Sequence, residues 1–193
     1  MVAVEAELKA LARNPERIHA ALSRRAVGEH SIYSDRYFDY PDRRWTRQGT
    51  ELRVRTVTDD LGQTRAVLTF KQPAVDEASG SKPEHETAVE NADMLVTVLT
   101  ALGVEQIIAF EKRCVNYRFT AQGRDLLATM VTVPELAGQT FIELETLADP
   151  DDVHAALDIV RSVLRELGIK DSDLTTQAYT DAVATRRNTG PPS

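Results

Sequence analysis

The stretch that decides the fold is Glu5-Ala6-Glu7-Leu8-Lys9, in which charged and apolar residues alternate. Side chains at every second position of a β-strand share one face of the sheet, so Glu5, Glu7 and Lys9 point the same way. Val4 and Leu8 point the other way and form an apolar face. The alternation therefore predicts a strand over residues 2–9 with one charged face and one buried face.

The same alternation recurs in three later segments. Leu52-Arg53-Val54-Arg55 places two guanidinium groups on one face of a strand, whereas Glu84-His85-Glu86 and Phe141-Ile142-Glu143-Leu144-Glu145 each place two carboxylates on one face. One interpretation is an antiparallel sheet whose polar face is solvated, which is a common arrangement. The other interpretation is a closed or strongly curved sheet with these faces inward, which would form a charged cavity.

The inward interpretation predicts a particular chemistry. Neighbouring carboxylates repel one another unless a cation lies among them, and hard oxygen ligands suit Mg²⁺ or Mn²⁺. Arginine and lysine side chains on the opposite wall would then hold phosphate oxygens. The residues alone therefore suggest a metal-bridged polyphosphate site.

Segments with helical periodicity separate the groups of strands. Residues 14–25 begin with a candidate Asn14 cap followed by Pro15, and residues 92–102 end just before a glycine. Residues 150–167 carry the most regular apolar stripe in the chain. Further strands are expected within 32–71 and over 106–119, 125–132 and 140–146, with a mobile loop at 76–83. Many strands with helices inserted between groups predict an α+β fold with a largely antiparallel sheet.

Composition limits the classes of protein that fit. The 193 residues include 23 Lys and Arg against 30 Asp and Glu, so the net charge is −7, which argues against a general nucleic-acid-binding surface. The single cysteine, Cys114, excludes an internal disulfide and a multi-cysteine zinc site. No apolar run approaches the roughly 20 residues that span a bilayer, and no secretory signal is visible. We expect a cytoplasmic, membrane-independent protein with one domain over residues 1–184 and a disordered tail over 185–193.

Five ordered blocks of the chain resemble the CYTH superfamily, the triphosphate tunnel enzymes that include class IV adenylyl cyclases and thiamine triphosphatases. The family's E-x-E-x-K signature is similar to Glu5–Lys9. The other blocks that resemble the family are Tyr37-Phe38-Asp39 with Leu52–Arg55, Thr69-Phe70-Lys71, Lys82-x-Glu84-x-Glu86 and Phe141–Glu145. The ending Leu167-Gly168-Ile169 with Asp171–Leu174 and Ala178-Tyr179 is closest to the cyclase branch. The resemblance covers residues 2–183 and implies an antiparallel β-barrel or tunnel with helices packed outside.

The resemblance also implies a role for each matching residue. Glu5, Glu7, Glu143 and Glu145 would bind one or two divalent cations, Mg²⁺ or Mn²⁺. Phosphates would be held by Arg53, Arg55, Lys71, Lys82 and Lys112, with Lys9 near the metal-bound phosphate. Glu84 and Glu86 would line the opposite wall and orient these cations. Tyr37, paired with Lys71, would be a candidate base that activates water, although a tyrosine that is simply buried in the sheet is the more ordinary interpretation.

Two positions depart from the family pattern. Cys114 stands where the second basic residue of the family's K-x-R strand is expected, after Lys112. Met130 or Val131 stands near the place of an aspartate that the family usually carries before the late E-x-E strand. Arg113, Arg118 or Arg124 could supply the lost positive charge, although strand parity argues against Arg113.

Three functions follow from these expectations. The first is a metal-dependent enzyme acting on a nucleoside or organic triphosphate, foremost an adenylyl cyclase that converts ATP to cyclic AMP and pyrophosphate. A triphosphatase acting on tripolyphosphate or thiamine triphosphate is the alternative within that class. The second is a module that binds a polyphosphate without turnover, and the third is a divergent enzyme for another phosphorylated metabolite. The expected partners are the triphosphate or polyphosphate itself, with a homodimer left open.

Overall fold

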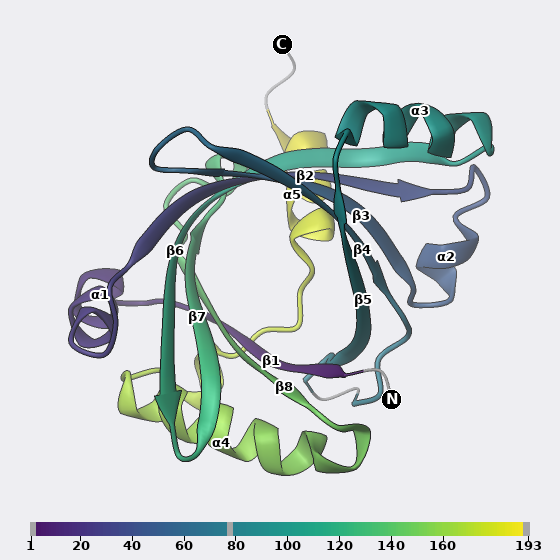
Figure 1. Ribbon diagram of the computed structural model, residues 1–193. Helices are drawn as coiled ribbons and strands as arrows, with labels where there is room; N and C mark the ends of the chain where they lie inside the picture. The colour runs from purple at the N-terminus through teal and green to yellow at the C-terminus, as the bar shows by residue number, and fades with distance from the viewer. Residues whose placement is uncertain (1–2, 77–78, 191–193) are drawn as a thin grey trace.

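The computed structural model describes residues 3–76 and 79–190 and contains a closed barrel of eight strands (Figure 1). Around the barrel the strands follow the order β1-β5-β4-β3-β2-β6-β7-β8, and every neighbouring pair is antiparallel. The predicted antiparallel barrel is confirmed. The strands are β1 (Val4–Leu11), β2 (Glu29–Asp39), β3 (Glu51–Asp59), β4 (Thr64–Lys71), β5 (Lys82–Val89), β6 (Glu105–Ala121), β7 (Arg124–Thr132) and β8 (Phe141–Ala148).

Five α-helices are described, and they surround the barrel or cover one of its ends. Figure 1 shows α1 and α4 outside one side of the wall and α2 and α3 outside another, with α5 visible through the barrel opening. None of the described helices is long and apolar enough to cross a membrane. The helices are α1 (Pro15–Ser23), α2 (Arg44–Arg47), α3 (Ala92–Ala101), α4 (Val153–Glu166) and α5 (Tyr179–Thr189), and short 3₁₀ turns occupy Pro134–Leu136, Pro150–Asp152 and Asp171–Asp173.

The predicted helix boundaries are set by local capping. The Asn14 side chain accepts a hydrogen bond from the Arg17 backbone N–H at 3.2 Å, and Asn91 accepts one from Met94 at 2.9 Å. Each bond satisfies a backbone donor that has no partner within the helix. Gly103 follows α3 with a positive φ of 80°, a backbone conformation that glycine adopts without steric cost.

The main hydrophobic core lies outside the barrel. The outward faces of β1, β7 and β8 pack against α1 and α4, so the apolar half of each alternating strand is buried there. Helix α4 contributes its stripe because residues three and four apart share a helix face. Its buried residues are Val153, Ala156, Leu157, Val160, Val163 and Leu164. A core on the outside leaves the inward faces of the strands free to carry charge.

A second apolar cluster narrows one end of the barrel, which we call the closed end. It is formed by Tyr37, Phe110, Cys114, Val131, Val133, Tyr179 and Val183. Helix α5 supplies Tyr179 and Val183, and the segment that leads into it pairs with β1 through an Ala10–Leu174 bridge. The C-terminal segment therefore covers part of the barrel at this end and lines the cavity there.

Two sequence expectations are wrong in part. Residues 185–189, expected in a disordered tail, form the last turns of α5, because Arg187 donates hydrogen bonds to the Ala109 carbonyl at 2.7 Å and to Glu135 at 2.8 Å. Residues 191–193 lie outside the described residues. Within the expected loop at 76–83, Asp76 bridges Ser81 and β5 already begins at Lys82, whereas residues 77 and 78 are also outside the described part.

Candidate functional site

The charged strand faces point into the barrel, which excludes the interpretation of a solvated outer face. Two cavities of about 1050 Å³ and 230 Å³ occupy the interior. Both are lined by Glu5, Arg53, Arg55, Glu143 and Glu145, so they are two parts of one tunnel. The smaller part reaches the closed end. The larger part opens at what we call the wide mouth, which is lined by Ala3, Arg65, Arg118, Leu127 and Leu147.

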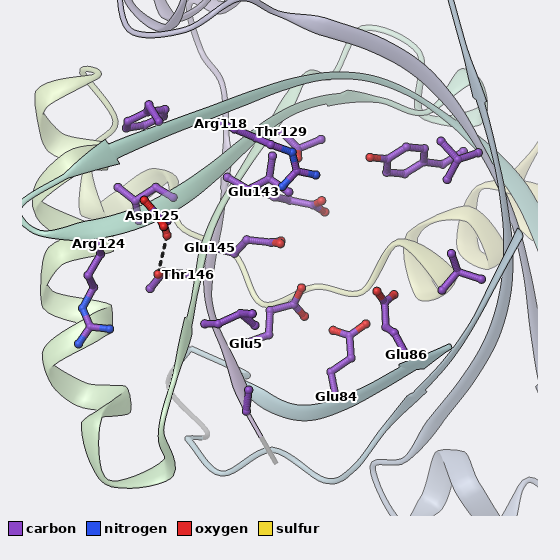
Figure 2. A pocket seen from close by; sticks show the side chains of 18 of the residues that line it. Glu5, Glu84, Glu86, Arg118, Arg124, Asp125, Thr129, Glu143, Glu145 and Thr146 are labelled. Atoms are coloured by element: carbon purple, nitrogen blue, oxygen red, sulfur yellow. Dashed lines mark hydrogen bonds between the residues drawn. The ribbon is translucent and has the colours of Figure 1, made fainter. Parts of the chain in front are cut away.

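Three carboxylates gather in the tunnel because of the register between β1 and β8. That register places Glu7 directly beside Glu145, with Glu5 on the same face of β1. One carboxylate oxygen from each of the three lies within 4.8 Å of the others. Figure 2 shows Glu5 and Glu145 pointing into the same space. These three of the four predicted metal ligands therefore form one group.

The electrostatics of this cluster fit a divalent cation. Burial, with the adjacent Glu143 and Glu5 carboxylates, raises the pKa of Glu7 to about 7. Burial and the negative charges of Glu5 and Glu7 raise the pKa of Glu145 well above its usual range. A bound Mg²⁺ or Mn²⁺ would relieve this repulsion, and oxygen ligands are the ones that both ions prefer.

Glu143 neighbours Glu7 but is not among these three carboxylates, and it lies toward the closed end. It forms an ion pair with Lys112 at 3.7 Å and faces Lys9 across the β1–β8 ladder. Burial alone would raise the pKa of Glu143, but these two ammonium groups hold the pKa below its usual value. The Tyr179 ring lies 4.5 Å from Lys9 Nζ and 4.1 Å from Lys112 Nζ, which are cation–π distances.

The opposite wall carries the predicted phosphate-binding residues. Lys71 contacts Glu5 and lies 3.0 Å from Glu84, and Arg53 lies 3.8 Å from Glu84. Burial tends to raise the pKa of Glu5, but the Lys71 ammonium outweighs it and holds that pKa well below the usual range. Burial and the neighbouring Glu5 raise the pKa of Glu84 to about 8. Glu84 thus lies between the cationic groups of Arg53 and Lys71.

The remaining predicted residues lie farther along the tunnel. The Lys82 ammonium donates to the Gly49 carbonyl at 3.1 Å and lines the part of the tunnel near the closed end. Glu86 accepts a hydrogen bond from the Thr69 hydroxyl at 2.8 Å and lines the larger cavity (Figure 2).

Asp35 is a tunnel residue that the sequence analysis missed. Its buried carboxylate accepts two hydrogen bonds from the Arg55 guanidinium, at 2.6 Å and 2.8 Å. Although burial tends to raise it, the pKa of Asp35 is held far below normal by Arg55 and Arg53. Its position two residues before Tyr37 predicts that both side chains share one strand face. Asp35 was missed because it is not part of an E-x-E type pair such as those of the other charged strands.

The structure does not support Tyr37 as a base. Its ring is buried and stacks on Phe110 with 5.5 Å between centroids, while its hydroxyl donates to Asp35 at 3.4 Å. Burial and the Asp35 charge raise the pKa of Tyr37 above its usual range. Lys71, the expected partner, instead contacts Glu5 and Glu84. Tyr37 packs in the closed-end cluster and also lines the smaller cavity.

The two departures from the family pattern also have structural outcomes. Cys114 is buried in the closed-end cluster, and burial with the Glu143 charge raises its pKa to about 12, so it carries no charge near neutral pH. Met130 faces the outer core and Val131 faces the closed end. The tunnel-facing residue beside Glu143 on β7 is Thr129, whose hydroxyl donates to Asn116 at 3.0 Å. Strand parity identifies this position once the register is known.

With this geometry established, comparison with known proteins decides the family. The model of the CYTH domain matches residues 3–179, which is nearly the whole chain. This protein belongs to the CYTH domain family. No curated protein sequence matches it. The CYTH assignment explains why carboxylates and cations share one interior, because members of this family act on triphosphates with the aid of a metal.

Solved structures show the same fold at low sequence identity. A protein from Pyrococcus horikoshii is 24% identical with a TM-score of 0.80, and the match covers 95% of this chain and 99% of that one. A "putative adenylate cyclase" from Vibrio parahaemolyticus is 19% identical with a TM-score of 0.79, over 96% and 99%. A "putative adenylyl cyclase" from Hippeastrum, described as having a dominant triphosphatase activity, is 17% identical with a TM-score of 0.61, over 95% of both chains.

Proposed function

We propose that this CYTH protein is a metal-dependent enzyme that acts on the triphosphate group of a nucleoside or organic triphosphate. The observation that carries the proposal is the meeting of two opposed groups inside one tunnel. The carboxylates of Glu5, Glu7 and Glu145 lie together on one wall. Arg53, Arg55 and Lys71 stand on β3 and β4, on the opposite wall. A polyanion bridged by a cation would be complementary to both walls.

The basic residues would bind the phosphate groups of the substrate. Arg53 and Arg55 donate planar pairs of N–H groups that match phosphate oxygens, and Lys71 supplies a point charge. Their carboxylate partners fix them before the substrate arrives, so less conformational freedom is lost on binding. Lys9 and Lys112, held against Tyr179, place two further positive charges toward the closed end.

Glu5, Glu7 and Glu145 would hold the cation. When bound, Mg²⁺ or Mn²⁺ would polarise phosphate oxygens and offset charge on the leaving group. In a cyclase reaction the ribose 3′-oxygen bonds to the α-phosphorus, the bond from that phosphorus to the bridging oxygen breaks, and pyrophosphate leaves. The hydroxyl proton passes to solvent, because the tunnel opens widely at the mouth.

Adenylyl cyclase activity is the first candidate, and it is supported by the cyclase-like ending of the chain. Tyr179 belongs to that ending, and it contacts both Lys9 and Lys112. Hydrolysis of the terminal phosphate is the second candidate, favoured by the Hippeastrum neighbour's described triphosphatase activity. Burial and the Asp35 charge raise the pKa of Tyr37, which disfavours a tyrosine base but leaves hydrolysis itself open.

One experiment separates these candidates. The protein is incubated with ATP and Mn²⁺, and cyclic AMP, pyrophosphate and phosphate are measured separately. The proposal predicts that cyclic AMP and pyrophosphate form in equal amounts. Phosphate without cyclic AMP would identify a triphosphatase. Glu145→Gln should abolish either activity, whereas Glu111→Gln, on the exposed outer face of β6, should not. Binding of ATP without any product would contradict the enzyme proposal.

A further inference from the structure

Four cations of the inner tunnel are engaged by carboxylates, whereas Lys9 and Lys82 donate to backbone carbonyls. Lys71, Arg53, Arg55 and Lys112 each form an ion pair with an interior acidic residue. Arg118 on β6 lines the larger cavity as well, yet it forms no ion pair or hydrogen bond with any residue among 3–76 and 79–190. A guanidinium carries five N–H donors, so Arg118 presents an unused, permanently charged group to the cavity.

The register places Arg118 in the same row as Glu145, two strands away. Arg118 pairs with Leu127 on β7, and Leu127 pairs with Glu145 on β8, so the three form one row across the wall. Two strand spacings separate the backbones of Arg118 and Glu145, which is roughly 10 Å. Figure 2 shows the Arg118 side chain directed into the cavity on the side of Thr129 and Glu143. A phosphate held by the carboxylate-bound cation would therefore lie within reach of this guanidinium.

Arg118 could supply the positive charge that is missing at position 114 of the same strand. Cys114 is uncharged and buried in the closed-end cluster, so the tunnel lacks a positive charge there. Arg118 stands four residues later on the same face of β6, roughly 13 Å closer to the wide mouth. Instead of two basic residues at positions 112 and 114, as in the family's K-x-R pattern, this strand carries Lys112 near the closed end and Arg118 in the row of Glu145.

The other arginines near this region are not equivalent. Arg113 lies on the outer face of β6 and lines a separate cavity. Arg124 lines the tunnel but contacts Asp152 at the start of α4. Arg65 also lines the wide mouth. It comes four residues before Thr69, which pairs with Glu86 on β5, so Arg65 is farther toward the rim than these two residues.

We propose that Arg118 is a substrate-binding residue that holds the phosphate group at the mouth end of the bound polyphosphate. The inference rests on the proposed function. It adds one residue that contacts the substrate and the orientation of the substrate in the tunnel. The phosphate chain extends from the basic wall toward the wide mouth, and the organic group lies beyond Arg118. That group would meet the aliphatic side chains of Val57, Val67, Leu127 and Leu147 that line the mouth.

The test measures tripolyphosphate binding by calorimetry in the presence of Mn²⁺. Arg118→Gln should weaken binding roughly tenfold, the effect of losing one hydrogen bond to a charged group. Arg113→Gln is the matched control, because it removes the same charge from the opposite face of the same strand and should leave the affinity unchanged. Arg118→Lys should keep most of the affinity, since it preserves the charge. Thermal unfolding of each variant establishes that it is folded.

The outcomes separate this inference from the proposed function. If the wild-type protein binds tripolyphosphate and Arg118→Gln binds it equally well, the role of Arg118 is wrong while the proposed function stands. Equal weakening by Arg118→Gln and Arg113→Gln would indicate a general charge effect and would also overturn the role. Absence of binding by the wild-type protein would overturn the proposed function itself.

Discussion

At the scale of single residues, Glu7 is the most informative group because its protonation reports the crowding of carboxylates. Its pKa is about 7 in the folded protein against 4.5 in the unfolded chain, owing to burial and to Glu143 and Glu5. The folded state therefore binds this proton more tightly than the unfolded state. Stability from Glu7 is fully present below about pH 4.5 and is lost as the pH rises through about 7.

We predict that Glu7→Gln flattens this pH dependence. In metal-free buffer the wild-type protein should lose unfolding free energy between pH 5 and 8, and the variant should lose less of it, by roughly 2 kcal/mol. Denaturant unfolding at several pH values measures both proteins. The exposed Glu111→Gln serves as control, and it should follow the wild-type curve. Parallel curves for wild type and Glu7→Gln would show that the carboxylates do not repel one another.

At the scale of elements, the apolar core and the charged site lie on opposite faces of the same strands. Leu144 on β8 packs outward against α4, while its neighbours Glu143 and Glu145 point into the tunnel. Stability and ligand binding should therefore be separable by mutation, because the buried residues of α4 pack on the outward faces of the strands.

Leu164→Ala tests this separation. Leu164 is fully buried in α4, so its truncation should cost about 2–5 kcal/mol of unfolding free energy. Tripolyphosphate affinity at a temperature where the variant is folded should stay within about twofold of wild type. Leu102→Ala, at an exposed position after α3, is the control and should change neither quantity. A large loss of affinity in folded Leu164→Ala would contradict the separation.

The strands could be predicted from the sequence, whereas helix α5 could not. Alternation in β1, β3, β5 and β8 predicts which side chains share a face, because a strand fixes that locally. Helix α5 was missed because only Tyr179 and Val183 of its residues are buried, so it carries no continuous apolar stripe. It is ordered instead by contacts with the closed end and by Arg187, which no local pattern reveals.

At the scale of the whole molecule, closure of the barrel creates the site. Glu7 and Glu145 are far apart in sequence, and they meet only because β8 pairs with β1 to complete the ring. Which charged residues face the tunnel could be predicted from the sequence, whereas the division of the four glutamates could not. Register places Glu143 with Lys112 and leaves Glu5, Glu7 and Glu145 as the group of carboxylates that could hold a metal ion. The Asp35–Arg55 pair likewise depends on the register between β2 and β3.

The most direct test of a metal-bridged polyphosphate tunnel is thermal unfolding with Mn²⁺ and tripolyphosphate, added singly and together. A ligand at about 100 times its dissociation constant adds roughly 2.7 kcal/mol, or about 5–10 °C for a chain of this size. We predict that the two together raise the melting temperature by more than the sum of their separate effects, and that Glu145→Gln loses this excess. A melting temperature unchanged by the combination, or an excess that survives in Glu145→Gln, would contradict the account.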